Sequence, residues 1–586
     1  MALNRLSLPL AAAIMMINAS LLLEGCLEEE RIALLQIKTS IFDPNQNHFG
    51  ASQLLSWGND TLCSSWTGVS CDPITGRVNK IVLYNVRGWF IDPSMAAWSR
   101  DTSMGDWYLN ATLFLPFQEL KTLGLRNNYM AGCVANEGFE RLSRLNKLEY
   151  LDLGLNNFNN SILSSLKGLS SLKHLFLDSN QLNGSIDTKD FDSLSKLEEL
   201  DLSGNEIQNF VTSTAGSERS MGLNKLEILG LSFNKFNDSS LSFLEGLSSL
   251  KQLNIDNNQL KGPMAMKGLC ELKQLQELDI SHNDLNGLPS CLANLTNLQV
   301  LDISSNEFTG NISLSPIGSL TSIRDLNLSD NRFRIPISLG PFFNLSNLKN
   351  LNGDNNEIYE STELEHNLIP RFQLQRLSLA CNGFGGTFPR FLYYQQDLLH
   401  VDLSYNKMTG EFPSWLLQNN TKLEELYLVN NSLSGSFQLP NRSHVNLSRL
   451  DISRNEIDNQ IPTEIGSCFP RLVFLNLSRN HFGGSIPSSI SNMSALDIID
   501  LSNNRLSGNI PEQLVEGSLS LRVLVLSNNH LKGQLLWRSF NLAYLTDLIL
   551  SGNQLTGILP DSLSNGSRLE ALDVSLNNLT VRYRDG

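Results

Sequence analysis

The sequence has few charged residues and none of the common catalytic motifs. Charged side chains make up 18% of the 586 residues, the formal net charge is -15, and no run of Lys and Arg suggests a phosphate-binding stripe. The patterns G-x-S-x-G, H-E-x-x-H and G-x-x-x-x-G-K-[ST] and the kinase signatures are absent. We therefore expect no nucleic-acid partner, no cofactor and no enzymatic activity.

Long apolar runs are also scarce. After residue 25 there is no stretch of 18 apolar residues, so the sequence as written predicts no second membrane anchor. The first 25 residues carry Arg5 and then a mostly apolar stretch from Leu6 to Leu23, which is typical of a cleaved secretory signal. We therefore expect the protein to be exported through the secretory pathway.

Cysteines are few, and none forms a C-x2-C pair of the kind that binds zinc, so no metal site is expected. Cys63 and Cys71 bracket a short segment before the repeats, and we predict that they form a disulfide in an N-terminal cap. Cys270 and Cys291 fall in neighbouring turns and are candidates for a second disulfide. The cysteines without an obvious partner are Cys26, Cys133, Cys381 and Cys468.

The dominant feature that is present is a repeat. The pattern L-x-x-L-x-L-x-x-N-x-L occurs nineteen times between Leu120 and Leu579, and its asparagine returns every 23 to 29 residues. This pattern predicts a leucine-rich-repeat solenoid, an α/β repeat fold that is curved and superhelical, with a parallel β-sheet on its concave face. Inward leucines such as Leu148, Leu151 and Leu153 should share one core, while each asparagine should bond backbone groups of its turn.

The segment before the repeats predicts a helical cap. Glu28 to Thr39 shows helical spacing with Ile32 and Leu35 on the apolar side, and Trp57 and Trp66 are expected to pack within the cap. The predicted boundaries are 1–25 for the signal peptide, 26–76 for the cap, 77–119 for a degenerate first repeat plus insertion, and 120–586 for the repeats, the last one incomplete.

Two interruptions break the even period. The first contains Trp89, Trp98, Trp107 and Tyr108, and we leave open whether these aromatic residues pack against the cap or contact a ligand. The second, at 212–222, is polar and is expected to be a tolerated surface insertion.

Binding residues should come from the outward positions of the strands. One outward column carries aspartates, and its regularity favours scaffold hydrogen bonding over ligand contact. Aromatic and histidine residues that break this regularity are the candidate ligand-binding residues, because exposed aromatic side chains often form interaction hot spots. These candidates are His174, Phe176, Phe233, His400, Tyr405, Tyr427 and Phe474.

Seventeen N-x-S/T sequons follow residue 25, as expected for a chain that passes through a glycosylating compartment. Asn327 and Asn476 lie within predicted strands, where a glycan would stand on the concave face. The other candidate sites that we name are Asn59, Asn110, Asn183, Asn294, Asn344, Asn446 and Asn492.

The chain resembles plant leucine-rich-repeat receptor-like proteins in three successive features. These are the stretch CLEEERIALLQIKTSI, the stretch LLSWGNDTLCSSWTGVSCD, and repeats with GGSIP and SGNIP forms. The resemblance implies a non-catalytic ectodomain at the plasma membrane or secreted, which binds an extracellular peptide, carbohydrate or protein. It also implies partner receptor kinases as adaptor or coreceptor, and a role in plant defence or development.

The chain departs from that family in two ways. Relatives continue into a membrane helix, whereas this sequence ends at TVRYRDG, so a truncated product is expected. Many relatives also carry adjacent cysteines before the cap tryptophan, one of which pairs with the cysteine that starts the helix. With only Cys63 there, Cys26 is expected to be unpaired.

The alternative to a receptor-like ectodomain is a secreted inhibitor resembling the polygalacturonase-inhibiting proteins, or a soluble decoy.

Overall fold

The computed structural model describes residues 26–41, 54–58, 62–87, 106–211, 223–237, 241, 243–263, 268–360, 369–516, 520–535, 544–559 and 568–581. The chain divides into two compact units, Met1–Leu298 and Gln299–Gly586. The predicted signal peptide, the polar insertion at 212–222, Trp89, Trp98 and Asn59 lie outside the described residues.

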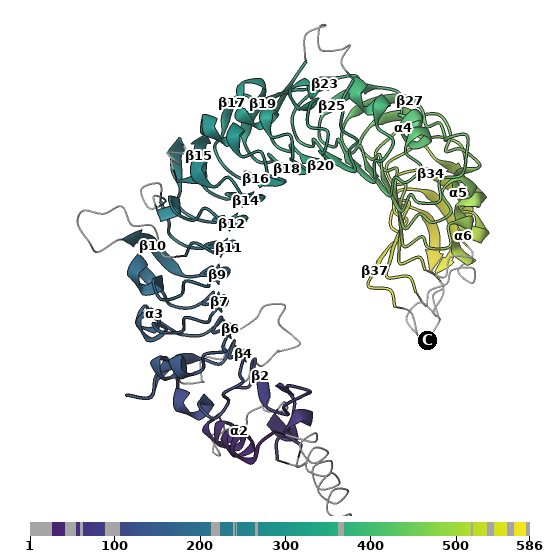
Figure 1. The fold of residues 1–586 in the computed structure, drawn as a ribbon. Helices are drawn as coiled ribbons and strands as arrows, with labels where there is room; N and C mark the ends of the chain where they lie inside the picture. Colours follow the sequence, from purple (N-terminus) through teal and green to yellow (C-terminus); the bar gives the residue numbers. More distant parts are fainter. Residues whose placement is uncertain are drawn as a thin grey trace, which may run out of the picture. The chain divides into compact units, whose positions relative to one another are not determined.

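In both units one short strand per repeat joins a main parallel sheet (Figure 1). The first unit contributes β2 (Val78–Val82), β4 (Thr122–Gly124), β6 (Tyr150–Asp152), β7 (His174–Phe176), β9 (Glu199–Asp201), β11 (Ile228–Gly230), β12 (Gln252–Asn254) and β14 (Glu277–Asp279). The strand β1 (Val69–Cys71) from the cap pairs antiparallel with β2. The predicted leucine-rich-repeat solenoid is confirmed.

The main-sheet strands of the second unit follow the same plan. They are β16 (Val300–Asp302), β18 (Asp325–Asn327), β20 (Asn350–Asn352), β22 (Arg376–Ser378), β24 (His400–Asp402), β26 (Glu425–Tyr427), β28 (Arg449–Asp451), β30 (Phe474–Asn476), β31 (Ile498–Asp500), β33 (Val523–Val525), β35 (Asp547–Ile549) and β37 (Ala571–Asp573).

Further along each repeat, short strands form small secondary sheets, and helices follow them on the side away from the main sheet (Figure 1). Three of the small sheets have two strands: β3 (Trp107–Leu109) pairs with β5 (Met130–Cys133), β8 (Asn183–Asp187) with β10 (Glu206–Val211), and β13 (Lys261–Pro263) with β15 (Asp284–Gly287). A three-stranded sheet has the order β17 (Thr309–Asn311), β19 (Arg332–Pro336) and β21 (Glu357–Tyr359). Two four-stranded sheets have the orders β23 (Gly385–Gly386), β25 (Lys407–Gly410), β27 (Ser432–Ser436), β29 (Glu456–Asp458) and β32 (Ser507–Gly508), β34 (His530–Gln534), β36 (Gln554–Leu559), β38 (Asn578–Val581). The α-helices of the repeats are α3 (Ser161–Ser165), α4 (Ser414–Asn419), α5 (Ile465–Cys468) and α6 (Glu512–Glu516).

Leucines supply the core of each unit, as the repeat predicts. Leu148, Leu151 and Leu153 are all 0% exposed, and the strand leucines of most other repeats are similarly buried, whereas Leu572 of the last repeat is 42% exposed. Burying one such side chain is worth about 1.5 to 3 kcal/mol, and here each is covered by the repeats on either side. Because the middle residue of each strand points inward, its two neighbours point outward in every repeat.

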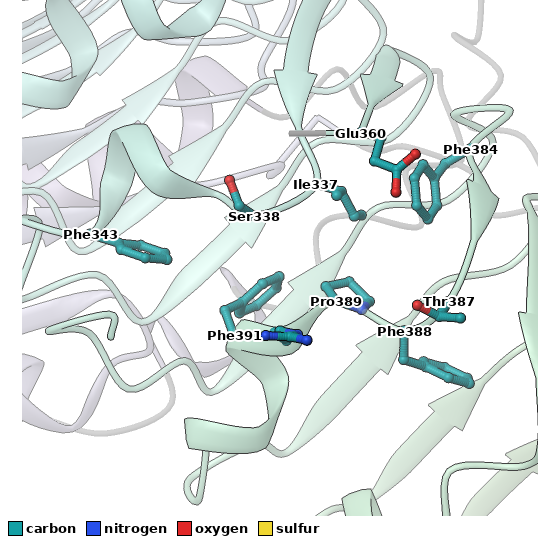
Figure 2. Close-up of a pocket in the computed structure, with 10 residues that line it drawn as sticks. Ile337, Ser338, Phe343, Glu360, Phe384, Thr387, Phe388, Pro389 and Phe391 are labelled. Carbon is teal, nitrogen blue, oxygen red and sulfur yellow. The ribbon is translucent and has the colours of Figure 1, made fainter. Parts of the chain in front are cut away.

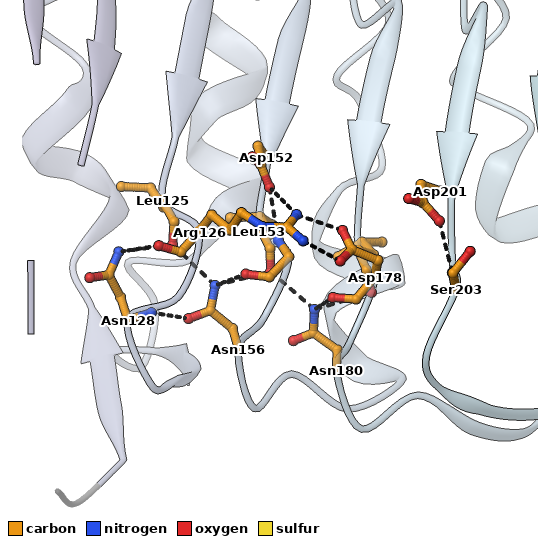
Figure 3. A network of polar contacts seen from close by, with 12 residues as sticks. Leu125, Arg126, Asn128, Asp152, Leu153, Asn156, Asp178, Asn180, Asp201 and Ser203 are labelled. Carbon is orange, nitrogen blue, oxygen red and sulfur yellow. Dashed lines mark hydrogen bonds and ion pairs between the residues drawn. The ribbon is translucent and has the colours of Figure 1, made fainter. Parts of the chain in front are cut away.

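The asparagines form a ladder of hydrogen bonds between successive turns, which confirms their predicted structural role (Figure 3). Nδ2 of Asn156 donates to the carbonyl oxygens of Leu125, Leu153 and Gly154 at 3.0 to 3.1 Å. Its Oδ1 accepts the backbone N–H of Asn128 at 3.0 Å. One amide therefore satisfies backbone groups in two repeats that would otherwise be buried without partners.

The ladder has one irregular step in the second unit. Asn382 Oδ1 accepts the backbone N–H of Asn356 at 2.6 Å, and its own N–H donates to Asn406 Oδ1 at 3.1 Å. Its buried Nδ2 finds no hydrogen-bond partner among the described residues. The bond to the preceding turn that Nδ2 forms in the neighbouring repeats, as from Asn406 to Leu379, is thus missing between β20 and β22.

The cap helix α2 (Glu28–Ile41) forms as predicted, but it buries a different face from the one expected. Ile32 is 45% exposed, whereas Ala33, Leu34 and Ile37 are buried. The helix is rotated because the buried carboxylate of Glu30 accepts hydrogen bonds from Arg77 Nε at 2.7 Å and from a backbone N–H at 3.1 Å. Leaving that carboxylate unpaired would be more costly than exposing one isoleucine.

The cap tryptophans pack as predicted. Trp57 and Trp66 are at most 2% exposed, and their rings stack with centroids 5.7 Å apart. Nε1 of Trp57 donates to the carbonyl oxygen of Thr67 at 2.9 Å. The pair therefore belongs to the core of the cap.

The predicted disulfide between Cys63 and Cys71 is wrong. Cys63 instead bonds to Cys26, with Cα atoms 5.8 Å apart, so the expectation that Cys26 is unpaired is wrong as well. Cys71 lies in β1, which pairs with β2 of the first repeat, and it remains a free thiol. The cap helix is thereby fastened to the segment that precedes β1.

The other cysteines behave as the sequence indicates. Cys270 and Cys291 are joined by a disulfide between neighbouring turns, with Cα atoms 5.7 Å apart. The remaining thiols, Cys133, Cys381 and Cys468, are free.

Replacing a ladder asparagine should destabilise the fold. Asn455 Nδ2 donates to three carbonyl oxygens at 2.8 to 3.2 Å, and its Oδ1 accepts the Leu433 N–H at 3.0 Å. We expect Asn455→Ala to lower the free energy of unfolding by about 2 to 4 kcal/mol, because several buried groups lose their partner. Urea denaturation followed by circular dichroism measures this change. The adjacent exposed residue is the control, and Glu456→Ala should change stability by less than about 0.5 kcal/mol.

The Cys71 thiol should react slowly in the native protein. Burial, with the nearby charge of Glu30, raises its pKa to about 11. At pH 8 only roughly one thiol in a thousand is then ionised, and the thiolate is the reactive form. Alkylation with iodoacetamide, followed by peptide mass spectrometry, should speed up as the pH rises toward 11. A native rate at pH 8 equal to that of the unfolded chain would contradict this expectation.

Candidate functional site

The candidate site lies on the face of the main sheet that carries the first and third residues of each strand, here called the sheet face. Its third positions are largely scaffold. Each aspartate of this column accepts the backbone N–H of the residue two positions later at 2.8 to 3.0 Å, which confirms the expected role. These aspartates are Asp152, Asp201, Asp279, Asp302, Asp402, Asp451, Asp500 and Asp573.

In the second unit the first positions of four successive strands form a connected row. His400, Glu425, Arg449 and Phe474 are direct neighbours in the register of β24, β26, β28 and β30. His400 Nδ1 lies 2.8 Å from one carboxylate oxygen of Glu425, and Arg449 Nε lies 3.7 Å from the other. The Arg449 guanidinium lies over the Phe474 ring, 5.9 Å from its centroid. The row is therefore held together by charge and cation–π contacts.

Tyr427 joins this row from the third position of β26. Its ring centroid lies 5.6 Å from that of His400. Burial raises the pKa of the Tyr427 hydroxyl, and the charge of Glu425 adds to the effect, so the group stays protonated as a hydrogen-bond donor. We call His400, Glu425, Tyr427, Arg449 and Phe474 the aromatic cluster.

The structure thus brings together three of the residues predicted from the sequence and separates a fourth. Tyr405 lies in the turn after β24, at φ 57°, with half of its surface exposed, and its backbone N–H bonds to Val429. Glu425 and Arg449 were missed because neither is aromatic. Their first-position placement on strands next to His400 and Phe474 was the available signal.

A hollow of about 320 Å³ lies on the sheet face next to the aromatic cluster, and His400 contributes to both. Buried Leu301, Leu326 and Leu351 form its floor. Arg376 at its rim is exposed and has no ion pair among the described residues. The polar lining residues are Asp302, Asp325, Asn327, Asn350, Asn352, Ser378 and His400. The hollow therefore offers carboxylates, amides and one free guanidinium over an apolar floor.

The first unit holds a smaller group on its own sheet face. His174 Nδ1 lies 2.9 Å from a carboxylate oxygen of Glu199. The rings of Phe176 and His174 lie 5.2 and 6.0 Å from that of Tyr150, a residue that the sequence did not single out. Phe233 is separate from this group, in a turn at φ 53° with 61% of its surface exposed.

An ion-pair network lies beside that group (Figure 3). Arg126 donates to both carboxylate oxygens of Asp178 at 2.5 and 2.7 Å and lies 3.4 Å from Asp152. It passes over Gly154, where a Cβ atom would lie only 2.2 Å from the guanidinium. The glycine allows Arg126 to bridge three repeats. The charge of Arg126 is therefore balanced by carboxylates of the same chain.

A second hollow of the second unit, about 230 Å³, is lined by no residue of a main-sheet strand; Figure 2 shows its lining side chains. Phe343, Phe384, Phe388 and Phe391 line it, with Arg390 and Glu360 as charged groups. All four phenylalanines are at most 9% exposed. They are core side chains of the repeats and offer little surface to a ligand.

The candidate glycosylation residues fall into two groups. Asn183, Asn294, Asn344, Asn446 and Asn492 are exposed, whereas Asn110 is half-buried and caps a short helical turn by accepting the Thr112 N–H at 2.9 Å.

In the tryptophan-rich interruption, Trp107 is buried in β3 and Tyr108 is 55% exposed.

Asn327 and Asn476 differ from those residues because both ends of their amides are bonded. Asn327 Nδ2 donates to Asp302 at 2.8 Å, and its Oδ1 accepts the hydroxyl of Ser329 at 2.8 Å. Asn476 Nδ2 donates to Asp451 at 3.0 Å, and its Oδ1 accepts the hydroxyl of Ser478 at 2.7 Å.

Among the described residues, no group of three or more His, Cys, Asp or Glu side chains could hold a metal ion. No described helix combines the length and the apolar character that a membrane span requires.

Family comparisons agree with the repeat and the cap. The leucine rich repeat N-terminal domain family matches residues 27–72, and a leucine rich repeat family matches residues 146–207. A further leucine rich repeat family matches 274–295, 297–320, 446–468, 471–493, 495–516 and 544–565.

Among curated proteins, the chain is 35% identical over 475 residues to Receptor-like protein 13 of Arabidopsis thaliana, covering 69% of this chain and 42% of that protein. The chain spans less than half of the length of the first curated relatives that it matches.

Two solved structures are similar along most of the chain. The ectodomain of the Arabidopsis thaliana receptor kinase GASSHO1/SCHENGEN3, in complex with CASPARIAN STRIP INTEGRITY FACTOR 2, has a TM-score of 0.70 and 28% identity, covering 93% of this chain and 62% of that chain. The Arabidopsis receptor kinase HAESA, in complex with the peptide hormone IDA and the co-receptor SERK1, has a TM-score of 0.64 and 27% identity, covering 94% and 90%.

The cap, the repeat and these similarities define a plant-type leucine-rich-repeat ectodomain. More particularly, the chain belongs to the plant leucine-rich-repeat receptor-like proteins.

We expect Asn327 and Asn476 to carry no glycan in the exported, folded protein. A glycan on Nδ2 would disturb a bond to the neighbouring aspartate on a half-buried surface, so modified chains should fold poorly. Glycopeptide mass spectrometry of the secreted protein measures occupancy, and the exposed sequons Asn294 and Asn344 serve as the comparison. High occupancy at Asn327 or Asn476 would contradict the prediction and would mean that the sheet face is partly covered.

Proposed function

We propose that the chain is a recognition ectodomain that binds an extracellular peptide on the sheet face of its second unit and acts with a partner receptor kinase. The observation that carries the proposal is the hollow of about 320 Å³ next to the aromatic cluster. Polar groups over an apolar floor, flanked by half-exposed rings, suit a ligand with both backbone amides and apolar side chains.

The chemistry of the hollow favours a peptide. Each peptide unit offers one N–H and one C=O, and carboxamides such as that of Asn352 can pair with either. Arg376 offers an unpaired guanidinium at the rim, which suits a ligand carboxylate. Tyr427 and Phe474 provide the large side chains that commonly dominate binding energy.

The relatives support a receptor role. One curated relative is named a receptor-like protein, and the two similar ectodomains were solved with a bound peptide hormone or integrity factor, one of them with a co-receptor. By this analogy we propose secretion or plasma-membrane display with the repeats outside the cell, and signalling through a receptor kinase in defence or development.

The proposal is tested by screening the exported protein against a library of extracellular plant peptides, followed by calorimetry on any ligand found. We expect Tyr427→Ala and Phe474→Ala each to weaken binding about 10- to 100-fold, as hot-spot residues do. His400→Ala and Arg376→Ala should have smaller effects, since each removes a partly exposed polar contact.

Two further variants serve as controls. Gln252→Ala changes the same strand position in the first unit and should leave affinity unchanged. Tyr405→Ala lies outside the aromatic cluster and should also have little effect. Wild-type affinity in both Tyr427→Ala and Phe474→Ala would remove the aromatic cluster from the binding site.

A further inference from the structure

The second unit carries an exposed group of basic side chains where the chain turns away from the main sheet. Arg454, Arg479, His481, Arg505 and His530 lie in four successive repeats, and all five are exposed. We call them the basic edge. In a chain with a net charge of -15, a local group of this kind has no evident role in solubility.

Arg454 and Arg479 occupy equivalent positions in adjacent turns. Their φ angles are 56° and 54°, and each backbone N–H donates at 2.9 Å to the next repeat, to the carbonyl oxygens of Ser478 and Ser502. Because the two backbones have the same conformation and register, the side chains leave in the same direction. The two side chains therefore start at equivalent points of adjacent repeats.

The other three members also occupy equivalent positions in adjacent repeats. Their position in the repeat lies two residues after the one that Arg454 and Arg479 occupy. The backbone N–H groups of His481, Arg505 and His530 donate to the preceding repeat at 2.7 to 2.8 Å. The three side chains thus form a second row, and Arg479 and His481 belong to the same turn. Glu456 occupies the preceding position of that row and bounds the basic edge on one side.

The arginines of the basic edge differ in their pairing from Arg332 and Arg334 of the same unit. Elsewhere in the second unit, Arg332 pairs with Glu307 of the neighbouring repeat at 3.2 Å, and Arg334 pairs with Glu357 at 3.0 Å. For Arg454, Arg479 and Arg505, the described part of the chain provides no ion pair. Guanidinium groups in a row without carboxylates match an anionic ligand.

We propose that the basic edge binds an acidic segment of a peptide, through its carboxylate side chains. The choice of a peptide rests on the proposed function, because β28 and β30 carry Arg449 and Phe474 at one end and lead into Arg454 and Arg479 at the other. Five residues separate Arg449 from Arg454, which is at most about 16 Å because the chain turns after β28 ends at Asp451. A peptide seated on the aromatic cluster can therefore cross the strands and place acidic residues against the basic edge.

The contact is tested on its own with a labelled octaglutamate peptide and the full exported chain. Fluorescence anisotropy at low ionic strength should show binding that weakens steeply as salt is raised, because exposed charges are screened within about 10 Å at 0.1 M. The double variant Arg454→Ala/Arg479→Ala should lower the affinity at least about fivefold, and octaglutamine should not bind.

The matched control is Arg332→Ala, which removes an exposed arginine that already has a carboxylate partner, and it should leave octaglutamate binding unchanged. Circular dichroism of each variant checks folding. Absence of octaglutamate binding would overturn the proposal even if a peptide ligand depends on Tyr427 and Phe474. Conversely, octaglutamate binding that is lost only in the double variant supports the proposal that the basic edge binds an acidic segment. It does so even if substitutions in the aromatic cluster leave peptide binding unchanged.

A second arm separates peptide from polysaccharide. If oligogalacturonate of similar charge binds more tightly than octaglutamate, and the double variant abolishes that binding, the assignment to an acidic peptide is overturned in favour of an acidic glycan. Weaker oligogalacturonate binding supports the peptide.

Discussion

The hydrogen bonds of the ladder asparagines are the interaction on which the rest of the structure depends. Each amide binds carbonyl oxygens of its own turn and of the turn before, as Asn455 does with Ile452 and Leu428. The leucines provide the larger share of the free energy, but they are not directional. The amides fix the register of neighbouring turns, so equivalent outward positions are aligned from repeat to repeat. Any function that uses several repeats at once relies on that alignment.

The sequence predicted what is periodic and local. Leucine and asparagine recur at fixed spacing, so the solenoid, the buried leucines and the bonded aspartates followed directly. The cap was harder because it occurs once. Whether Cys63 bonds to Cys26 or Cys71 depends on where α2 docks, and the buried carboxylate of Glu30 decides which helix face turns inward. Neither fact is encoded by spacing.

The candidate site was predictable only in part, for a related reason. Aromatic residues at outward positions could be found by counting along the repeat, which located His400, Tyr427 and Phe474. The partners that join them, Glu425 and Arg449, are ordinary charged residues whose meaning comes from the strands on either side. In a parallel sheet of three-residue strands, such contacts are always between residues about 25 apart in sequence.

The missing hydrogen bond of Asn382 Nδ2 has a consequence for how the second unit unfolds. In a linear array each repeat is held mainly by its neighbours, so unfolding starts where nearest-neighbour coupling is weakest. Between β20 and β22 the coupling lacks the Nδ2 bond to the preceding turn that other ladder asparagines of this unit form, as Asn455 does with Leu428. Under mechanical load or heat, cooperativity would break at this junction first, and the hollow, which draws residues from both sides of it, would lose its shape before the turns that carry Phe474 do.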